Sequence, residues 1–469
     1  MDGLTRRRLL AVAGTTALAG CPDFGASGEA ETTPFDATAV QTAVSGPLPE
    51  VPEPFPVLVA PSHFDGARRA VRSTLDELPD PIPSAGTLDE TTRAPVRRSV
   101  ERAREKLAAA DDAATTRERL GSLRYAQYSA ERAASTWAFA TDELSREAVR
   151  SRGITLERNV DSFRDDRTLV GDPDDPVRAL LVHPIVESLT EDAADDATPE
   201  WDDYEPASSD APTADDTEAE QLPDALAVGQ RAAAVAMGRA RLADARHLAE
   251  RFADSLTDSR SMRPRFVDAR ESLTTTLDGR VTDLPGTEAN DAEELVGSDA
   301  SGVGRAVESA LRKLHAHAHY FADRDPTADP ASDVLARYEG IATVDAFLSL
   351  RDRVASDSSF AVDSAAALRE RRSAAVTGIE NALEASADRR LARELLAFPV
   401  AKLASTDAAL REWGEPAIQR AAVGDRARYY VEFAALARAV PAAVDETLAA
   451  LGAGGSDRAT RYLPRRNGR

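Results

Sequence analysis

The chain has 469 residues, 80 of them acidic and 57 basic, and its formal net charge is −23 at pH 7. One cysteine and 5% aromatic residues exclude a small domain held together by disulfides. The surplus of acid argues against a nucleic-acid partner, because such a partner requires clustered positive charge to neutralise its phosphates.

Arginine replaces lysine almost everywhere, and the only lysines are Lys106, Lys313 and Lys402. This composition resembles that of proteins from extreme halophiles. Short carboxylates keep a protein hydrated in concentrated salt, which in turn screens their mutual repulsion. A GC-rich genome would favour arginine codons but would not raise the acids so far above the bases. We therefore expect a protein adapted to high salt.

Residues 1–20 are arranged like an export signal, in which three arginines precede a short stretch of small and apolar residues. That stretch is too short to span a bilayer. The motif around Arg6 and Arg7 resembles the twin-arginine export motif, although Leu9 and Ala11 stand where phenylalanine and lysine are common. This route carries folded cargo, which suits a protein that must fold in salt before export.

The signal ends in Leu18-Ala19-Gly20-Cys21, which resembles a lipobox. Together the two motifs resemble a twin-arginine-exported lipoprotein of haloarchaeal type, and the resemblance covers only this end of the chain. It implies cleavage before Cys21, attachment of a lipid to its sulfur, the twin-arginine translocase as a partner during export, and a lipid anchor in the cell membrane on its extracytoplasmic face. Because Cys21 is the only cysteine, no thiol remains for a disulfide or a nucleophile.

Residues 21–61 are predicted to form a lipidated, proline-rich and disordered tether. Residues 22–61 hold eight prolines and no lysine or arginine. Proline-rich chain favours an extended helix of about 3.1 Å per residue, which makes a semi-rigid spacer. The short β-like run Val57-Leu58-Val59 is expected to dock on the folded body.

Apolar residues at three- and four-residue spacing predict two helical domains, at 62–190 and 225–452. Pro399 and Pro441 lie inside helical patterns, where each is expected to kink or break the helix. The individual segments are predicted near 62–78, 88–112, 116–144, 146–164, 176–190, 222–258, 262–278, 302–323, 331–353, 362–386, 388–413 and 425–450.

Residues 191–224 separate the two predicted domains and carry fourteen acids without a lysine or arginine. They hold too few apolar side chains to offset the entropy of ordering, so we predict a disordered acidic linker or loop. A calcium loop is disfavoured because the Asp-x-Asp-x-Asp-Gly pattern is missing. Residues 453–469 are predicted to be a basic disordered tail. The fold class expected is all-α, as helical bundles or an extended helical array.

Histidines supply the only candidate metal ligands. In His315-Ala316-His317-Ala318-His319 the flanking apolar residues follow helical spacing, so His315 and His319 share one face while His317 points away. Such a pair needs further ligands from elsewhere. Asp244 lies three residues before His247, but chance accounts for one such pair among six histidines. We therefore assign no metal ligand, no cofactor and no catalytic residue.

The sequence favours a non-catalytic binding or structural module of the cell envelope, anchored through Cys21. One alternative is a helical metal-binding protein or metalloenzyme that uses His315 and His319, or His247. Another is a transporter-associated solute-binding lipoprotein, which is less favoured because no strand-crossover pattern of two α/β lobes is visible.

Overall fold

The computed structural model describes residues 34–83, 88–197, 224–297, 303–356 and 361–453. Within these ranges the chain forms fourteen helices and four two-residue strands, which confirms the all-α prediction. The signal, Cys21, most of the acidic linker and nearly all of the basic tail lie outside the described residues. Residues 191–197, which were predicted to be disordered linker, are helical. No helix in the described part of the chain combines the length and the apolarity needed to cross a bilayer.

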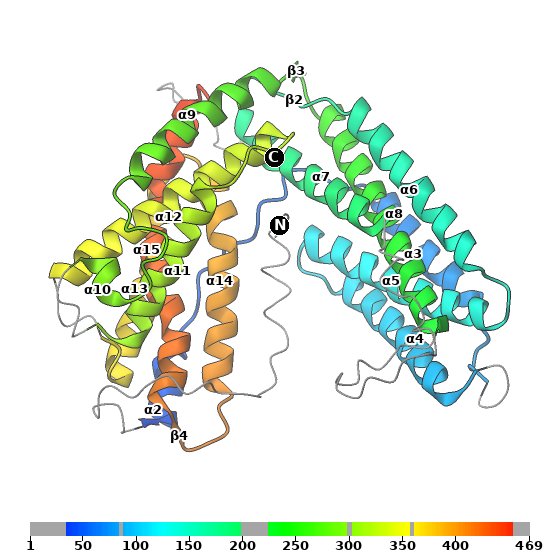
Figure 1. The fold of residues 1–469 in the computed structure, drawn as a ribbon, viewed down its shortest axis with the longest axis horizontal. Coiled ribbons are helices and arrows are strands. Elements are labelled where there is room, and N and C mark those ends of the chain that lie inside the picture. Colours follow the sequence, from blue (N-terminus) through cyan, green and yellow to red (C-terminus); the bar gives the residue numbers. More distant parts are fainter. Residues whose placement is uncertain (1–33, 84–87, 198–223, 298–302, 357–360, 454–469) are drawn as a thin grey trace, which may run out of the picture.

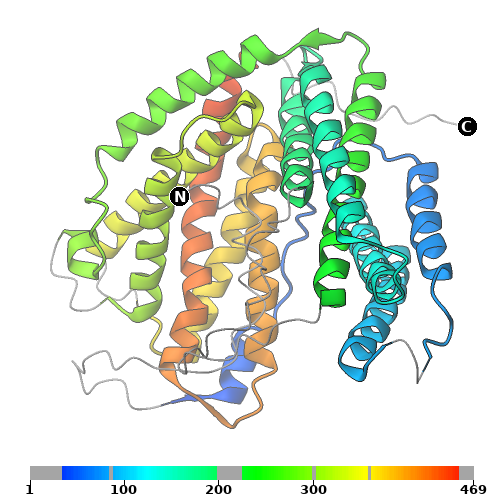
Figure 2. The same ribbon diagram turned by 45° about the vertical axis from the view of Figure 1, so that its right-hand side comes forward.

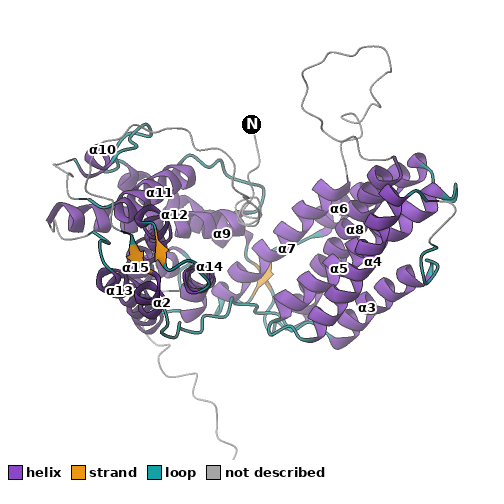
Figure 3. Cartoon of the chain, turned by 90° about the horizontal axis from the view of Figure 1, so that it is seen from below, coloured by secondary structure: helices purple, strands orange, loops and turns teal. Residues whose placement is uncertain are grey.

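The helices form two bundles that meet at one end (Figures 1 and 3). The first contains α3 (Pro61–Asp76), α4 (Glu90–Asp111), α5 (Thr116–Ala140), α6 (Arg146–Asp166), α7 (Pro176–Ala197) and α8 (Asp224–Asp254). The second contains α2 (Ala37–Ala43), α9 (Arg263–Val281), α10 (Ala292–Val296), α11 (Arg305–Ala322), α12 (Pro330–Ser356), α13 (Ala365–Ala385), α14 (Arg389–Arg411) and α15 (Arg420–Ala450).

Polar residues fix where several helices begin. Thr115 and Glu118 form a reciprocal capping box at the start of α5, and Ser145 and Ser364 cap α6 and α13 through their side-chain oxygens. Of the kink or break expected at each proline, no break occurs, since α14 continues through Pro399 and α15 through Pro441. In each case packing of the buried face outweighs one lost backbone hydrogen bond.

Helix α8 packs chiefly on α5 and α7, whereas the predicted domain division placed it with the second half. Small residues explain the pairing, because both helices bury several alanines and Gly229 of α8 lies directly against Arg132 and Thr136 of α5. The first bundle therefore extends to the end of α8. α15 lies at the centre of the second bundle, where α9, α11, α12, α13 and α14 all contact it.

Residues 34–60 differ from the predicted tether, since they pack along the folded body. β1 (Phe35–Asp36) pairs antiparallel with β4 (Ala417–Ile418), and Val40 and Val44 are buried. Arg372 donates hydrogen bonds to the carbonyl oxygens of Gly46 and Pro47. From there the segment rises beside α14 and crosses to α3 in the first bundle (Figure 2). Val57 is buried as expected for the docking run, although Leu58 is exposed.

Short strands and a shared core join the bundles. β2 (Val170–Gly171) pairs antiparallel with β3 (Arg260–Ser261) at the top of Figure 1. The largest apolar cluster continues from the second bundle through α7 to Leu248 and Phe252 near the end of α8. The junction is therefore a packed region rather than a bare linker.

Candidate functional site

The residues assigned to export and lipidation, Arg6, Arg7 and Cys21, lie outside the described residues. The structure instead brings together a group of polar residues from α11, α14 and α15 that the sequence analysis did not single out. We call this group the Glu432 cluster, and it consists of Lys313, His317, Lys402, Arg428, Tyr429 and Glu432. α11 and α14 both pack against α15, which places their side chains around one region of that helix.

Glu432 is the buried acid of this cluster. Glu432 is only 7% exposed, and the Oε2 atom of its carboxylate has no hydrogen-bond partner. Burial raises the pKa of Glu432 to about 7, although the positive charges of Arg428, Lys313 and Lys402 act in the opposite direction. No nitrogen of these three cations lies within salt-bridge distance of the carboxylate among the described residues. The acid is therefore desolvated without a direct partner.

Two further buried polar atoms of the cluster lack hydrogen-bond partners, namely Nε of Arg428 and Nε2 of His317. Burial, assisted by Lys313 and Arg428, lowers the pKa of His317 to about 4, so its imidazole is neutral at pH 7. Buried polar groups in folded proteins normally find partners, and three exceptions in one place are typical of a site that receives a ligand.

Aromatic rings lie beside these polar groups. Arg428 donates a 2.8 Å hydrogen bond to the hydroxyl oxygen of Tyr429, and Nζ of Lys402 lies 4.6 Å from the centre of the Tyr429 ring. Phe433 stacks on Tyr429 and meets Phe398 edge to face. Phe398 is 53% exposed, so the aromatic group reaches the surface.

The histidines of α11 divide as the helical spacing predicts. His317 belongs to the Glu432 cluster, whereas His315 and His319 line a separate cavity of about 390 Å³. The other lining residues are Thr287, Glu288, Ala289, Asn290, Arg312 and Ala316. The two Nε2 atoms are 3.1 Å apart, and those of His315 and His319 lie 3.1 Å and 3.0 Å from the carbonyl oxygen of Pro285. Burial lowers the pKa of His315.

His247 and Asp244 do not converge on one point. His247 stacks on His63 with ring centres 4.1 Å apart, and its Nε2 accepts a 3.1 Å hydrogen bond from the backbone N–H of Ala60. Asp244 instead bridges His63 and Arg124 at 2.7 Å each. Because these contacts use the groups that a metal would need, the His247 alternative is not supported. Across the described ranges, no three side chains from His, Cys, Asp and Glu gather in a metal-holding arrangement.

Sequence reasoning missed the Glu432 cluster because its members come from three separate helices, α11, α14 and α15, which only the fold brings together. One signal was available, since two of the only three lysines, Lys313 and Lys402, belong to it.

Comparison with known families divides the chain as the packing does. Residues 62–258 match the model of a domain of unknown function (DUF8262), and residues 263–449 match that of a second domain of unknown function (DUF8264). No curated protein and no solved structure matches the chain. Each matched range corresponds to one helical bundle, except that α2 of the second bundle precedes both ranges, and the division falls at β3 between α8 and α9.

Proposed function

We propose that the chain is a lipid-anchored binding protein on the extracytoplasmic face of the cell membrane of a salt-adapted organism. Its helical body binds a small anionic ligand at the Glu432 cluster. The location rests on the resemblance of residues 1–21 to a twin-arginine lipoprotein signal. The observation that carries the binding function is the buried Glu432 carboxylate, which has an unpartnered oxygen among three cations.

The chemistry of the cluster indicates the class of ligand. Lys313, Lys402 and Arg428 supply charge for a carboxylate or phosphate, and Glu432 supplies an acceptor for an amino or hydroxyl group. The rings of Phe398 and Tyr429 offer apolar contact to the rest of the molecule. Amino acids, hydroxy acids and sugar phosphates combine these features. Because the cluster is buried, its attraction for a charged ligand persists in concentrated salt, which screens buried charges much less than exposed ones.

Calorimetric titration of the purified full chain with these three classes of compound, in concentrated KCl, tests the ligand assignment. We expect one class to bind, and we expect Lys402→Gln and Glu432→Gln to weaken that binding at least tenfold. Lys106→Gln is the matched control, because Lys106 is the one lysine outside the cluster and lies on α4. Equal binding by all three variants would show that the ligand binds elsewhere.

The anchor has a separate test. Replacement Cys21→Ser removes the sulfur that the lipid needs, so the exported protein is expected in the medium instead of the membrane fraction. Replacement of Arg6 and Arg7 by lysine is expected to retain the protein in the cell, which distinguishes failed export from failed anchoring. Membrane retention of Cys21→Ser equal to that of the unaltered chain would refute the lipid anchor.

A further inference from the structure

Three polar atoms near the C-terminal end of α11 form a nearly equilateral triangle. Nε2 of His315, Nε2 of His319 and the carbonyl oxygen of Pro285 are separated by 3.1, 3.0 and 3.1 Å. α11 supplies both imidazoles from positions one turn apart, and the loop between α9 and α10 supplies the oxygen. His315 is buried, while His319 faces the cavity more openly.

Hydrogen bonds alone do not satisfy all three sides of this triangle. Each Nε2 atom is either a donor or an acceptor, and the carbonyl oxygen only accepts. If both nitrogens carry protons, both can donate to the Pro285 oxygen, but the two N–H groups then lie 3.1 Å apart with like partial charges. If one nitrogen lacks its proton, its lone pair faces the lone pairs of the Pro285 oxygen. At least one side is therefore repulsive in every neutral arrangement of protons.

A divalent cation bound to all three atoms, outside the plane of the triangle, makes every contact attractive. Metal–ligand distances of about 2.0–2.1 Å in a tetrahedral site place neighbouring ligand atoms about 3.3–3.4 Å apart. The observed sides are within a few tenths of an ångström of that spacing. Imidazole nitrogens with an oxygen ligand suit zinc and its neighbours among the first-row transition metals.

The cavity beside the triangle provides a position for a fourth ligand. Glu288 lines the same cavity as the two histidines, and its negative charge acts on His315. Its carboxylate lies over Gly286, where a Cβ added to the glycine would be 2.5 Å from Oε1. Arg312 also lines the cavity, and its guanidinium pairs with Glu308 at 3.7 Å.

We propose that His315, His319 and the Pro285 carbonyl oxygen bind a divalent transition-metal ion, with a solvent molecule as the fourth ligand and Glu288 as a nearby negative charge in the same cavity. Only two side chains are needed as ligands, because the backbone oxygen of Pro285 completes the triangle. It is independent of the Glu432 cluster and of the lipid anchor.

Zn²⁺ titration by calorimetry, followed by metal analysis after dialysis, tests the site on the purified full chain without a histidine tag. We expect one equivalent of Zn²⁺ per chain. Because loss of an outer-shell group already costs 10–100-fold in metal affinity, we expect His319→Ala to cost more than ~100-fold and Glu288→Gln about tenfold. His317→Gln is the matched control on the same helix and should bind Zn²⁺ as the unaltered chain does.

Co²⁺ provides a second readout that does not depend on affinity alone. Its visible absorption should be strong, as for tetrahedral coordination by nitrogen and oxygen, and should disappear in His319→Ala. Circular dichroism of each variant checks that the helices remain folded. Absence of a bound equivalent in the unaltered chain, or retention of full affinity by folded His319→Ala, would overturn the proposal.

Discussion

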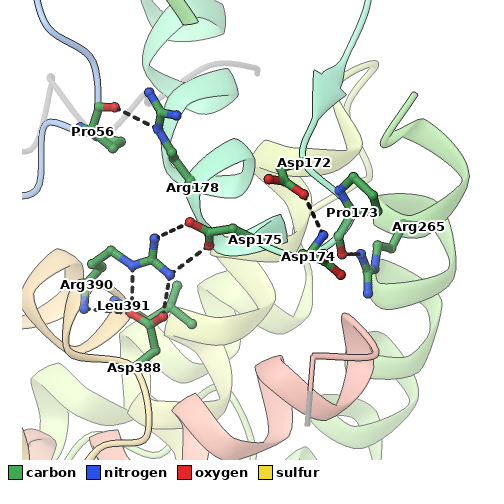
Figure 4. Close-up of polar contacts among 10 residues, drawn as sticks. All are labelled: Pro56, Asp172, Pro173, Asp174, Asp175, Arg178, Arg265, Asp388, Arg390 and Leu391. Atoms are coloured by element: carbon green, nitrogen blue, oxygen red, sulfur yellow. Dashed lines mark hydrogen bonds and ion pairs between the residues drawn. The ribbon is translucent and has the colours of Figure 1, made fainter. Parts of the chain in front are cut away.

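Arg390 donates two parallel hydrogen bonds of 2.8 Å to the two carboxylate oxygens of Asp175, and this pair joins the first turn of α14 to the residue before α7 (Figure 4). Asp388 accepts a further bond from the same guanidinium. Burial lowers the pKa of Arg390, but these hydrogen bonds outweigh it and raise the pKa above its ordinary value. The Arg390–Asp175 pair thus links the two bundles, which correspond to the two matched domain families.

Replacement Arg390→Gln should weaken the junction of the bundles. The Arg390 side chain is 36% exposed, so solvent screening limits its contribution, and we expect a loss of about 1 kcal/mol in the free energy of unfolding. Denaturant unfolding at fixed salt measures it. Arg389→Gln is the control, since the neighbouring Arg389 is exposed, and it should change stability by less than ~0.5 kcal/mol. Equal effects of the two variants would contradict a role for the pair.

The long helices were predictable from the sequence, whereas the packing of the N-terminal segment was not. Apolar spacing over many turns identifies segments such as α5 and α15, because their buried faces repeat at the helical period. Residues 34–60 show no such period. They are held by single contacts, such as β1 with β4 and Arg372 with Gly46, between residues far apart in the chain. α2 and α10 are too short to give a periodic signal.

The candidate sites show the same contrast between local features, which the sequence predicts, and contacts between distant residues, which it does not. Helical spacing correctly separated His317 from His315 and His319, because that spacing is a local property. Glu432 is one acid among 80, and only the packing of α11 and α14 around α15 distinguishes it. The carbonyl oxygen of Pro285 is equally invisible to sequence reasoning, because any residue carries such an oxygen.

The close approach of α5 and α8 depends on Gly229. A Cβ at this position would lie 2.9 Å from the carbonyl oxygen of Arg132, a backbone atom, and would overlap the side chain of Thr136. Gly229→Ala should therefore destabilise the protein by about 1–3 kcal/mol through overpacking. Gly121→Ala, within α5, meets nothing within 4 Å and should stabilise by about 0.5–1 kcal/mol. Thermal unfolding of the two variants should move the melting temperature in opposite directions; a shared direction would contradict the packing.

Asp244 is the shared acceptor of a buried network in the first bundle. It is 6% exposed and bonds to both Arg124 and His63, and burial lowers the pKa of Arg124. Asp244→Asn leaves this guanidinium buried without its opposite charge, so we expect a loss of about 3–5 kcal/mol in stability. Asp258→Asn removes an acid from an exposed pair with Arg260 and should leave stability almost unchanged. Losses of similar size would argue against the network.

The raised pKa of Glu432 makes stability depend on pH in a defined direction. Its pKa rises from 4.5 to about 7 on folding because the carboxylate is buried, so the folded state binds the proton more tightly. Stability from this group is present below pH 4.5 and is lost as pH rises to about 7. The loss amounts to up to about 3 kcal/mol.

Glu432→Gln keeps the shape of the side chain without the charge. We therefore expect this variant to be more stable than the unaltered chain at pH 8 by up to about 3 kcal/mol, and the difference to close as pH falls toward 4.5. Denaturant unfolding at several pH values measures the difference. Glu384→Gln, at an exposed position of α13, should give a difference near zero that does not change with pH. A pH-independent difference for Glu432→Gln would mean that the carboxylate is solvated or paired in the folded protein, and the Glu432 cluster would then lose the feature that marks it as a binding site.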